Sequence, residues 1–115
     1  MNTTKLGNEG EKIAKDYLES NGYTILKTNF KSAGGEIDII ATKGRHLSFV
    51  EVKTRKDNAF GYGADFVDYH KQQKIIRAAK AFLISFDAFD EISFDVCEVY
   101  TLKRCINYIE NAFEA

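Results

Sequence analysis

Two strand-like segments of the sequence carry charged residues among large apolar ones. The segment "EIDIIAT" (36–42) contains Asp38, and the segment "HLSFVEVKT" (46–54) contains Glu51 and Lys53. Strands normally alternate polar and apolar residues so that one face can be buried. Carboxylates within apolar runs need a reason to be there, so these three residues are the first candidates for a site.

The two segments can pair as an antiparallel hairpin. If Gly44 and Arg45 form a two-residue turn, with glycine at the first position as type II′ turns prefer, the numbers of opposed residues sum to 89. Asp38 then lies directly opposite Glu51, and a four-residue loop gives the same register. Lys53 shares the face of Glu51 because side chains alternate with a period of two. The sequence thus predicts one face that presents all three residues together.

A pair of opposed carboxylates is unfavourable unless a cation lies near both. Cβ atoms of opposed residues lie about 4.5–5.5 Å apart, where two carboxylates repel by roughly 3 kcal/mol at an effective dielectric constant of about 20. A divalent cation reverses that sign, and Mg²⁺ is commonly held by one or two carboxylates with waters and substrate phosphate. The neighbouring lysine could then hold the attacking water or stabilise charge on a phosphate. The alternative is that the acids lie on a solvated face or at opposite ends of the sheet.

Composition and charge place the chain among ordinary globular domains. Its 115 residues predict one domain covering residues 1–115, with 44% hydrophobic and 29% charged residues. A net charge of −1 argues against a protein that holds nucleic acid by bulk electrostatics. The charge is uneven, however, because residues 43–80 carry nine basic and four acidic side chains. This basic segment is either a nucleic-acid contact or the solvated face of a helix.

Targeting and redox signals are weak throughout the chain. No segment approaches the roughly 20 apolar residues of a membrane span, and the N-terminal sequence lacks the apolar stretch of a signal peptide. Cys97 and Cys105 match no zinc spacing, and we expect both to be reduced thiols. We therefore expect a cytoplasmic protein with no membrane partner.

Hydrophobic periodicity predicts two helices and five strands. The helices are expected from about Thr3 to Asn21 and from Phe66 to about Ile84, the strands at 23–30, 36–42, 46–54, 91–100 and, as a short piece, 105–111, and a loop at 55–65. A helix that connects the third and fourth strands requires them to be parallel. The expected fold class is α/β, a mixed sheet flanked by helices in the order α-β-β-β-α-β-β.

Two glycines lie on the apolar stripe of the first helix. Glycine inside a helix costs about 1 kcal/mol relative to alanine, so Gly7 and Gly10 predict close approach of this helix to the sheet. Glu11 lies at the edge of the same stripe. We expect it to look along the sheet surface instead of straight into solvent.

Taken together, these residues resemble a known pattern. Asp38 followed, after a hairpin, by Glu51-Val52-Lys53 is similar to the bipartite motif of the PD-(D/E)xK nucleases, which have the restriction-endonuclease-like fold. More closely, the chain resembles the YraN-like family of predicted endonucleases. The matching segments cover nearly the whole chain: "GNEGEKIAKDYLESNGYTIL", "NFKSAGGEIDIIA", "LSFVEVKTR", "FGYG", "VDYHKQQKIIRAAKAFL", "SFDV" and "NAF". The broader superfamily includes archaeal Holliday-junction resolvases.

The resemblance implies a site built around Mg²⁺ or Mn²⁺. It makes Asp38 and Glu51 metal ligands, with the backbone carbonyl of Val52 as a third. Lys53 becomes the catalytic lysine. Glu11 matches the first-helix acid that completes such sites, directly or through water.

Nucleic-acid contacts are expected along the third strand and the second helix. The candidates are Arg55, Lys71, Gln72, Gln73 and Lys74. Each of them could instead be an ordinary solvated side chain.

The chain departs from the family pattern at two positions. Ile37 stands before Asp38 in place of the superfamily's proline, and Ser93 stands before Phe94 where the family often has arginine. The second departure removes one candidate phosphate contact. Asp95, the next residue, alternates with apolar neighbours, and we expect it to have a structural role.

The leading expectation for function is a metal-dependent endonuclease that acts on DNA without strong sequence specificity, with branched and single-stranded DNA among the candidate substrates. One alternative is a non-enzymatic nucleic-acid-binding module that works with a partner protein. Another is a protein-interaction domain with a vestigial site. The residues do not distinguish DNA from RNA, or Mg²⁺ from Mn²⁺. A homodimer would be needed to cut two strands symmetrically, although the sequence reveals no interface.

Overall fold

A computed structural model describes residues 2–55 and 67–115. Its elements are α1 (Asn2–Ser20), β1 (Thr24–Ser32), β2 (Gly35–Lys43), β3 (His46–Arg55), α2 (Tyr69–Leu83), β4 (Glu91–Tyr100) and β5 (Cys105–Phe113). The predicted order α-β-β-β-α-β-β is therefore confirmed. So is the α/β class, and the architecture is consistent with the restriction-endonuclease-like fold.

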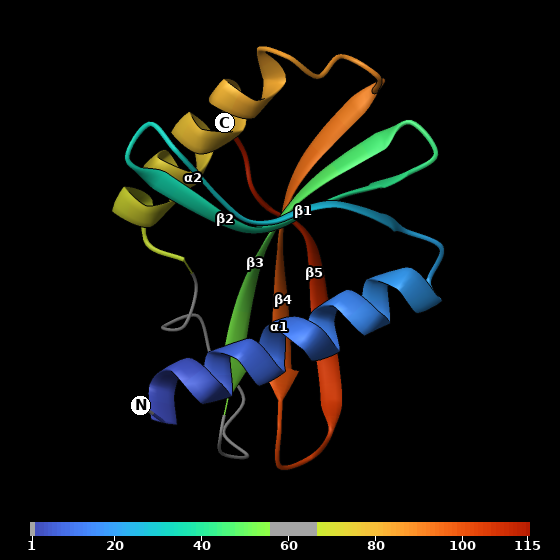
Figure 1. Ribbon diagram of the computed structural model, residues 1–115, viewed down its shortest axis with the longest axis vertical. Helices are drawn as coiled ribbons and strands as arrows, with labels where there is room; N and C mark the ends of the chain where they lie inside the picture. Colours follow the sequence, from blue (N-terminus) through green and yellow to red (C-terminus); the bar gives the residue numbers. More distant parts are fainter. Residues whose placement is uncertain (1, 56–66) are drawn as a thin grey trace.

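The five strands form one mixed sheet in the order β1-β2-β3-β4-β5. Neighbouring strands are antiparallel except β3 and β4, which are parallel as the intervening α2 requires. The two helices take opposite faces of the sheet (Figure 1). On one face, Leu18 of α1 packs against Val50 of β3, and on the other, Phe82 of α2 packs against Phe49 of β3.

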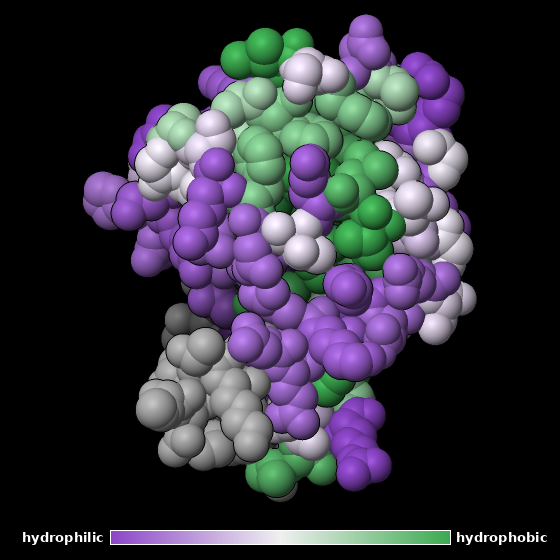
Figure 2. Space-filling model, viewed as in Figure 1, coloured by the Kyte–Doolittle hydropathy of each residue, from purple (hydrophilic) through white to green (hydrophobic). Residues whose placement is uncertain are grey.

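Helix α1 lies close to β3, as the glycine pattern predicted. Gly10 is buried, and a Cβ atom at this position would lie 2.0 Å from the Oγ1 atom of Thr54. The side of the molecule on which α1 lies is crossed by a band of hydrophilic residues (Figure 2). The missing side chain of Gly10 therefore lets the N-terminal half of α1 reach the end of β3 that carries the candidate site.

The β2–β3 hairpin has the predicted register. The observed pairs run from Lys43–His46 to Ile39–Val50, and each pair of residue numbers sums to 89. Gly44 has φ +62°, the sign that a type II′ turn requires at its first central position. The turn and the alternation together place Glu51 and Lys53 on the α2 side of β3, the side that also carries Phe49.

The far end of the β1–β2 hairpin bends against α2. A Cβ atom on Gly35 would lie 2.1 Å from the backbone carbonyl oxygen of Lys74, so a side chain there would collide with rigid backbone. Arg77 donates a hydrogen bond from Nε to the carbonyl oxygen of Ala33 in the hairpin turn. Figure 1 shows this end of β2 beside α2. The hairpin end and the first turns of α2 thus form the two walls of a groove.

Several predicted boundaries were wrong, each for a local reason. Helix α2 begins at Tyr69, not Phe66, because the side chain of Asp68 caps it by accepting a hydrogen bond from the backbone N–H of Lys71. Strand β1 extends to Ser32, because the turn needs only Ala33 and Gly34, both at positive φ. Most of the expected loop at 55–65 lies outside the described residues.

Strand β5 is longer than the predicted segment and continues to Phe113. The register with β4 shifts between Phe94 and Val96, and Asn111 takes φ +56° at this bulge. The fully buried Asp95 holds the bulge, because its carboxylate accepts hydrogen bonds from the backbone N–H of Asn111 and the hydroxyl of Tyr108. The geometry thus gives Asp95 the structural role expected for it.

Neither helix meets the length and apolarity needed to cross a membrane, within the residues that the structure describes.

Candidate active site

The two candidate acids meet where β2 and β3 stop pairing. Backbone pairing ends at Ile39–Val50, so Asp38 is not a ladder partner of Glu51 as predicted. Instead, the Oδ2 atom of Asp38 accepts a hydrogen bond of 2.8 Å from the backbone N–H of Val52. The reason is the bend of β2 toward α2, which removes its backbone from β3 and leaves a side chain to satisfy the freed donor.

Glu51 is buried, and its charge is balanced by a lysine from α2. Only 5% of its surface is exposed, and its Oε2 atom lies 2.7 Å from the Nζ atom of Lys71. Burial alone would lower the pKa of Lys71, but the hydrogen bond and charge of Glu51 outweigh it and raise the pKa above its ordinary value. Lys71, expected only as a phosphate contact, is therefore part of the carboxylate cluster.

Asp38 forms no ion pair with any residue that the structure describes, and its pKa is strongly shifted. Burial, followed by the negative charge of Glu51, raises its pKa to about 7. The hydrogen bond from Val52 lowers the pKa, Glu11 raises it further, and Lys71 opposes that effect. A carboxyl whose pKa is raised by burial and by a second carboxylate is a candidate for a functional site.

The stability of the metal-free protein should fall as pH rises from about 4 to about 7. Because the pKa of Asp38 is about 7 in the folded chain and 3.8 in a free carboxyl, the folded state holds this proton more tightly over that interval. Above pH 7 the loss of stability caused by the ionised Asp38 carboxylate no longer changes with pH. Asp38→Asn removes it, so in EDTA the variant should gain on the order of 2 kcal/mol relative to wild type between pH 5 and pH 8.

Denaturant melts at the two pH values measure this difference. Asp87→Asn, a substitution at an exposed carboxylate, is the matched control and should show no such gain. An equal pH response of wild type and Asp38→Asn would contradict the perturbed carboxyl.

The other predicted members of the catalytic set lie around this pair. Glu11 is half-buried on α1, and its charge acts on Asp38. Lys53 is half-buried, one strand step beyond Glu51 on the same side of β3. The N–H and C=O groups of one strand residue point to the same edge, so we expect the Val52 carbonyl to point toward Asp38, as its N–H does.

Another buried acid, absent from the predicted set, lies beside Lys53. Glu98 of β4 is the register partner of Lys53 and is 6% exposed. Its carboxylate accepts hydrogen bonds from Arg55, Tyr100 and Asn107. Burial would raise the pKa of Glu98, but these three donors together lower it below its ordinary value. The sequence contained a signal for this residue, because Glu98 lies on the same face of its strand as the apolar Phe94 and Val96.

The remaining candidates divide between this cluster and the surface. Arg55 is drawn into the network of Glu98, with its Nη2 atom 3.1 Å from Oε2. Gln72 donates to the carbonyl oxygen of Val67 and so helps to hold the start of α2, while Gln73 is half-buried. Lys74 is exposed and lines a cavity beside Lys71.

The donor set fits a hard divalent cation better than zinc. No three His, Cys, Asp or Glu side chains converge into a metal-binding group within residues 2–55 and 67–115. Structural zinc requires four such ligands, whereas Mg²⁺ keeps several waters and uses only one or two carboxylates. Asp38, Glu51 and the expected Val52 carbonyl are three oxygen donors, and burial together with the charge of Glu51 raises the pKa of Asp38.

The fold and this cluster together define a class of protein. It is an α/β domain of restriction-endonuclease-like architecture, with an Asp…Glu-x-Lys set on two adjacent strands. The sequence profile described as "Uncharacterised protein family UPF0102" matches residues 10–99. The chain therefore belongs to UPF0102, which is the YraN family, as the resemblance predicted.

Relatives of similar length exist in several bacteria. A UPF0102 protein of Caldanaerobacter subterraneus subsp. tengcongensis is 45% identical over 98% of both chains. One of Clostridioides difficile is 45% identical over 98% of this chain and 100% of its own. A more distant one, from Legionella pneumophila, is 36% identical over 98% of both chains. The similarity spans the whole length of these proteins, and their names state no activity.

Proposed function

We propose that this protein is a divalent-metal-dependent endonuclease that hydrolyses phosphodiester bonds in DNA without strong sequence specificity. The observation that carries the proposal is the closeness of Asp38 to the buried Glu51, whose charge raises the pKa of Asp38, at the diverging ends of β2 and β3, with Lys53 two residues beyond Glu51. A half-buried carboxyl beside a buried carboxylate is costly for a purely structural element. The two carboxylates are suitable as protein ligands of a divalent cation.

Asp38, Glu51 and the Val52 carbonyl are the residues that would hold Mg²⁺ or Mn²⁺. A cation bound there would supply Lewis-acid activation of water and of the scissile phosphate. Glu11 lies close enough to influence Asp38 and would orient a water on the α1 side. The hydrogen bond from Val52 keeps the Asp38 carboxylate in place.

The chain's own cations would stabilise the charge that develops on the phosphate. Lys53 would donate from Nζ to a phosphate oxygen or to the attacking water, because it follows Glu51 on the same side of the strand. Lys71 balances Glu51 in the absence of other cations and would turn to substrate phosphate when a metal takes its place. The network around Glu98 would position Arg55 beside this region.

A non-enzymatic nucleic-acid-binding module is the second candidate. It is favoured by the contact between Lys71 and Glu51, since an internal ammonium can satisfy the carboxylate without any metal. Such a module would bind nucleic acid equally well in EDTA and would leave it intact.

Cleavage assays on the full chain distinguish the two candidates. The substrates are single-stranded, linear duplex, flapped and four-way DNA, each with Mg²⁺, Mn²⁺ or EDTA, and an RNA strand as comparison. We expect cleavage of at least one DNA with metal and none with EDTA. Tight binding of these DNAs with no cleavage under any metal would favour the module instead.

A further inference from the structure

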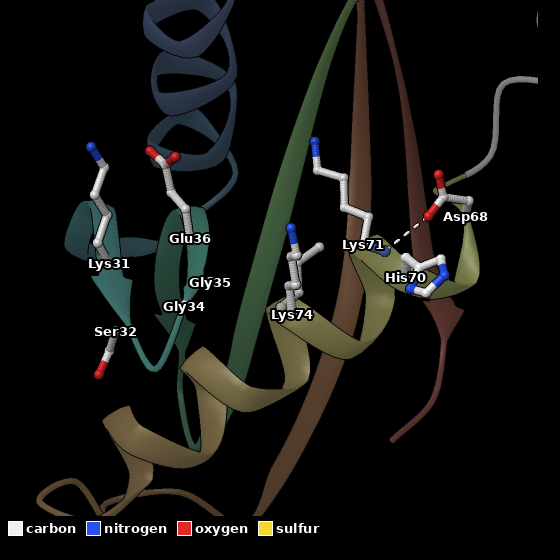
Figure 3. A pocket seen from close by; sticks show the side chains of 10 residues that line it. Lys31, Ser32, Gly34, Gly35, Glu36, Asp68, His70, Lys71 and Lys74 are labelled. Carbon is white, nitrogen blue, oxygen red and sulfur yellow. Dashed lines mark hydrogen bonds between the residues drawn. The ribbon is translucent and has the colours of Figure 1, made fainter.

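A cavity of about 740 Å³ lies between the end of the β1–β2 hairpin and the first turns of α2. One wall carries Lys31, Ser32 and Glu36, and the other carries His70, Lys71 and Lys74. Figure 3 shows the side chains of Lys31, Glu36, Lys71 and Lys74 extending toward the same side of the molecule. Only the α2 wall was expected from the sequence to meet nucleic acid.

Some of the charged side chains that line this cavity are hydrogen-bonded or ion-paired, and others are not. Asp68 is occupied by its hydrogen bond to the backbone N–H of Lys71, and Lys71 itself is bonded to Glu51. Lys31 and Lys74 are exposed on opposite walls, and neither ammonium contacts a carboxylate among the described residues. Two ammonium groups with no bonded carboxylate among the described residues therefore face one open cavity, and Glu36 is the strand partner of one of them, Lys31.

The cavity is continuous with the candidate active site. Lys71 belongs to both, because it lines the cavity and contacts the buried Glu51. Glu36 lies two residues before Asp38 on the same strand and acts on the charge of Lys71. A ligand that lies along the cavity would thus lead into the carboxylate pair.

We propose that this cavity binds the phosphate backbone of a single DNA strand, with Lys31 and Lys74 contacting successive phosphates beside the bond to be cut. The inference rests on the proposed function and adds the path of the substrate strand. Lysine ammonium groups bind phosphates as point charges, which suits contacts without base readout. Gly34 lines the cavity, and a Cβ atom built there would have no other atom within 4 Å, so this end of the hairpin wall is open to the backbone of a strand.

Binding of a fluorescein-labelled oligothymidylate in EDTA, measured by anisotropy, tests the proposal without cleavage. The variant is Lys31→Ala with Lys74→Ala. The matched control is Lys27→Ala with Lys80→Ala, which removes one exposed lysine from each of the same two elements, β1 and α2, outside the cavity. Both variants lower the net charge equally.

We expect the cavity variant to bind at least about tenfold more weakly at roughly 50 mM salt, and its salt-dependence slope to fall by about 1.4 for two lost phosphate contacts on a single strand. The control should change affinity less than about twofold. Inorganic phosphate at constant ionic strength should not displace the strand, and displacement at low concentrations would overturn the proposal in favour of a free-phosphate site.

Equal binding by the two variants would also overturn it. If metal-dependent cleavage then still required Asp38, the cavity proposal alone would fail and the proposed function would stand. If wild type bound neither the strand nor a divalent cation, both would fail.

Discussion

Asp38→Asn should abolish metal-dependent DNA cleavage while leaving the protein folded. Asparagine retains an oxygen that can accept the hydrogen bond from the Val52 N–H, so the local structure should persist. It removes one of the two negative charges that would hold the cation. We expect the rate of cleavage to fall at least about a thousandfold, or about 4 kcal/mol at 1.36 kcal/mol for each factor of ten.

The control is Asp87→Asn, the same substitution at an exposed carboxylate, which should cleave at the wild-type rate. Circular dichroism of both variants checks that the fold is intact. If a folded Asp38→Asn protein cleaved DNA at the wild-type rate, Asp38 and Glu51 would not form the active site.

Lys53→Met should lower cleavage by about 10²–10³-fold with little effect on metal binding. Methionine keeps the length and apolar stem of lysine and removes only the ammonium, which is proposed to act on the phosphate or the attacking water. Because Lys53 is not proposed as a ligand, calorimetric affinity for Mg²⁺ should change less than about threefold. The exposed Lys27→Met is the matched control and should retain full activity.

A comparison with Lys71→Met decides which lysine is catalytic. The sequence pattern favours Lys53, whereas the structure places the ammonium of Lys71, not Lys53, at 2.7 Å from Glu51. Loss of this ion pair should raise the affinity of the free protein for a divalent cation and lower cleavage less than Lys53→Met does. The opposite ranking would transfer the catalytic role to α2.

Much of the fold was predictable because its signals are local. The type II′ turn at Gly44 and the alternation on either side of it are enough to set the β2–β3 register, and the observed pairs match. The helix between β3 and β4 then requires those strands to be parallel, and they are. Gly10 predicted the close contact of α1 with the sheet through the absence of its side chain.

The sequence predicted which residues form the candidate site, but not which contacts they make. Alternation placed Asp38 and Glu51 on a common face, yet the bend of β2 ended the ladder one pair early and gave Asp38 a different partner. The contact between Lys71 and Glu51 depends on how α2 crosses the sheet, which no local pattern encodes. Glu98 could have been found, since it is an acid on the apolar face of its strand, like Glu51.

The predicted ends of the strands were wrong for another reason. Bulges and positive φ values at non-glycine residues, such as Asn29 and Asn111, depend on the tertiary contacts that support them. Sequence alternation alone therefore ended β5 two residues early.

Calorimetric titration of Mg²⁺ and Mn²⁺ into wild type and Asp38→Asn, with and without a DNA strand, asks directly whether the two acids form a cation site. We expect one cation site per chain in wild type, with affinity lowered at least about tenfold in the variant and weakened as pH falls below about 7, because Asp38 must lose its proton to bind the cation. A wild-type protein that binds neither cation, even with DNA present, would contradict this expectation. The carboxylate pair would then be a structural feature neutralised by Lys71 alone.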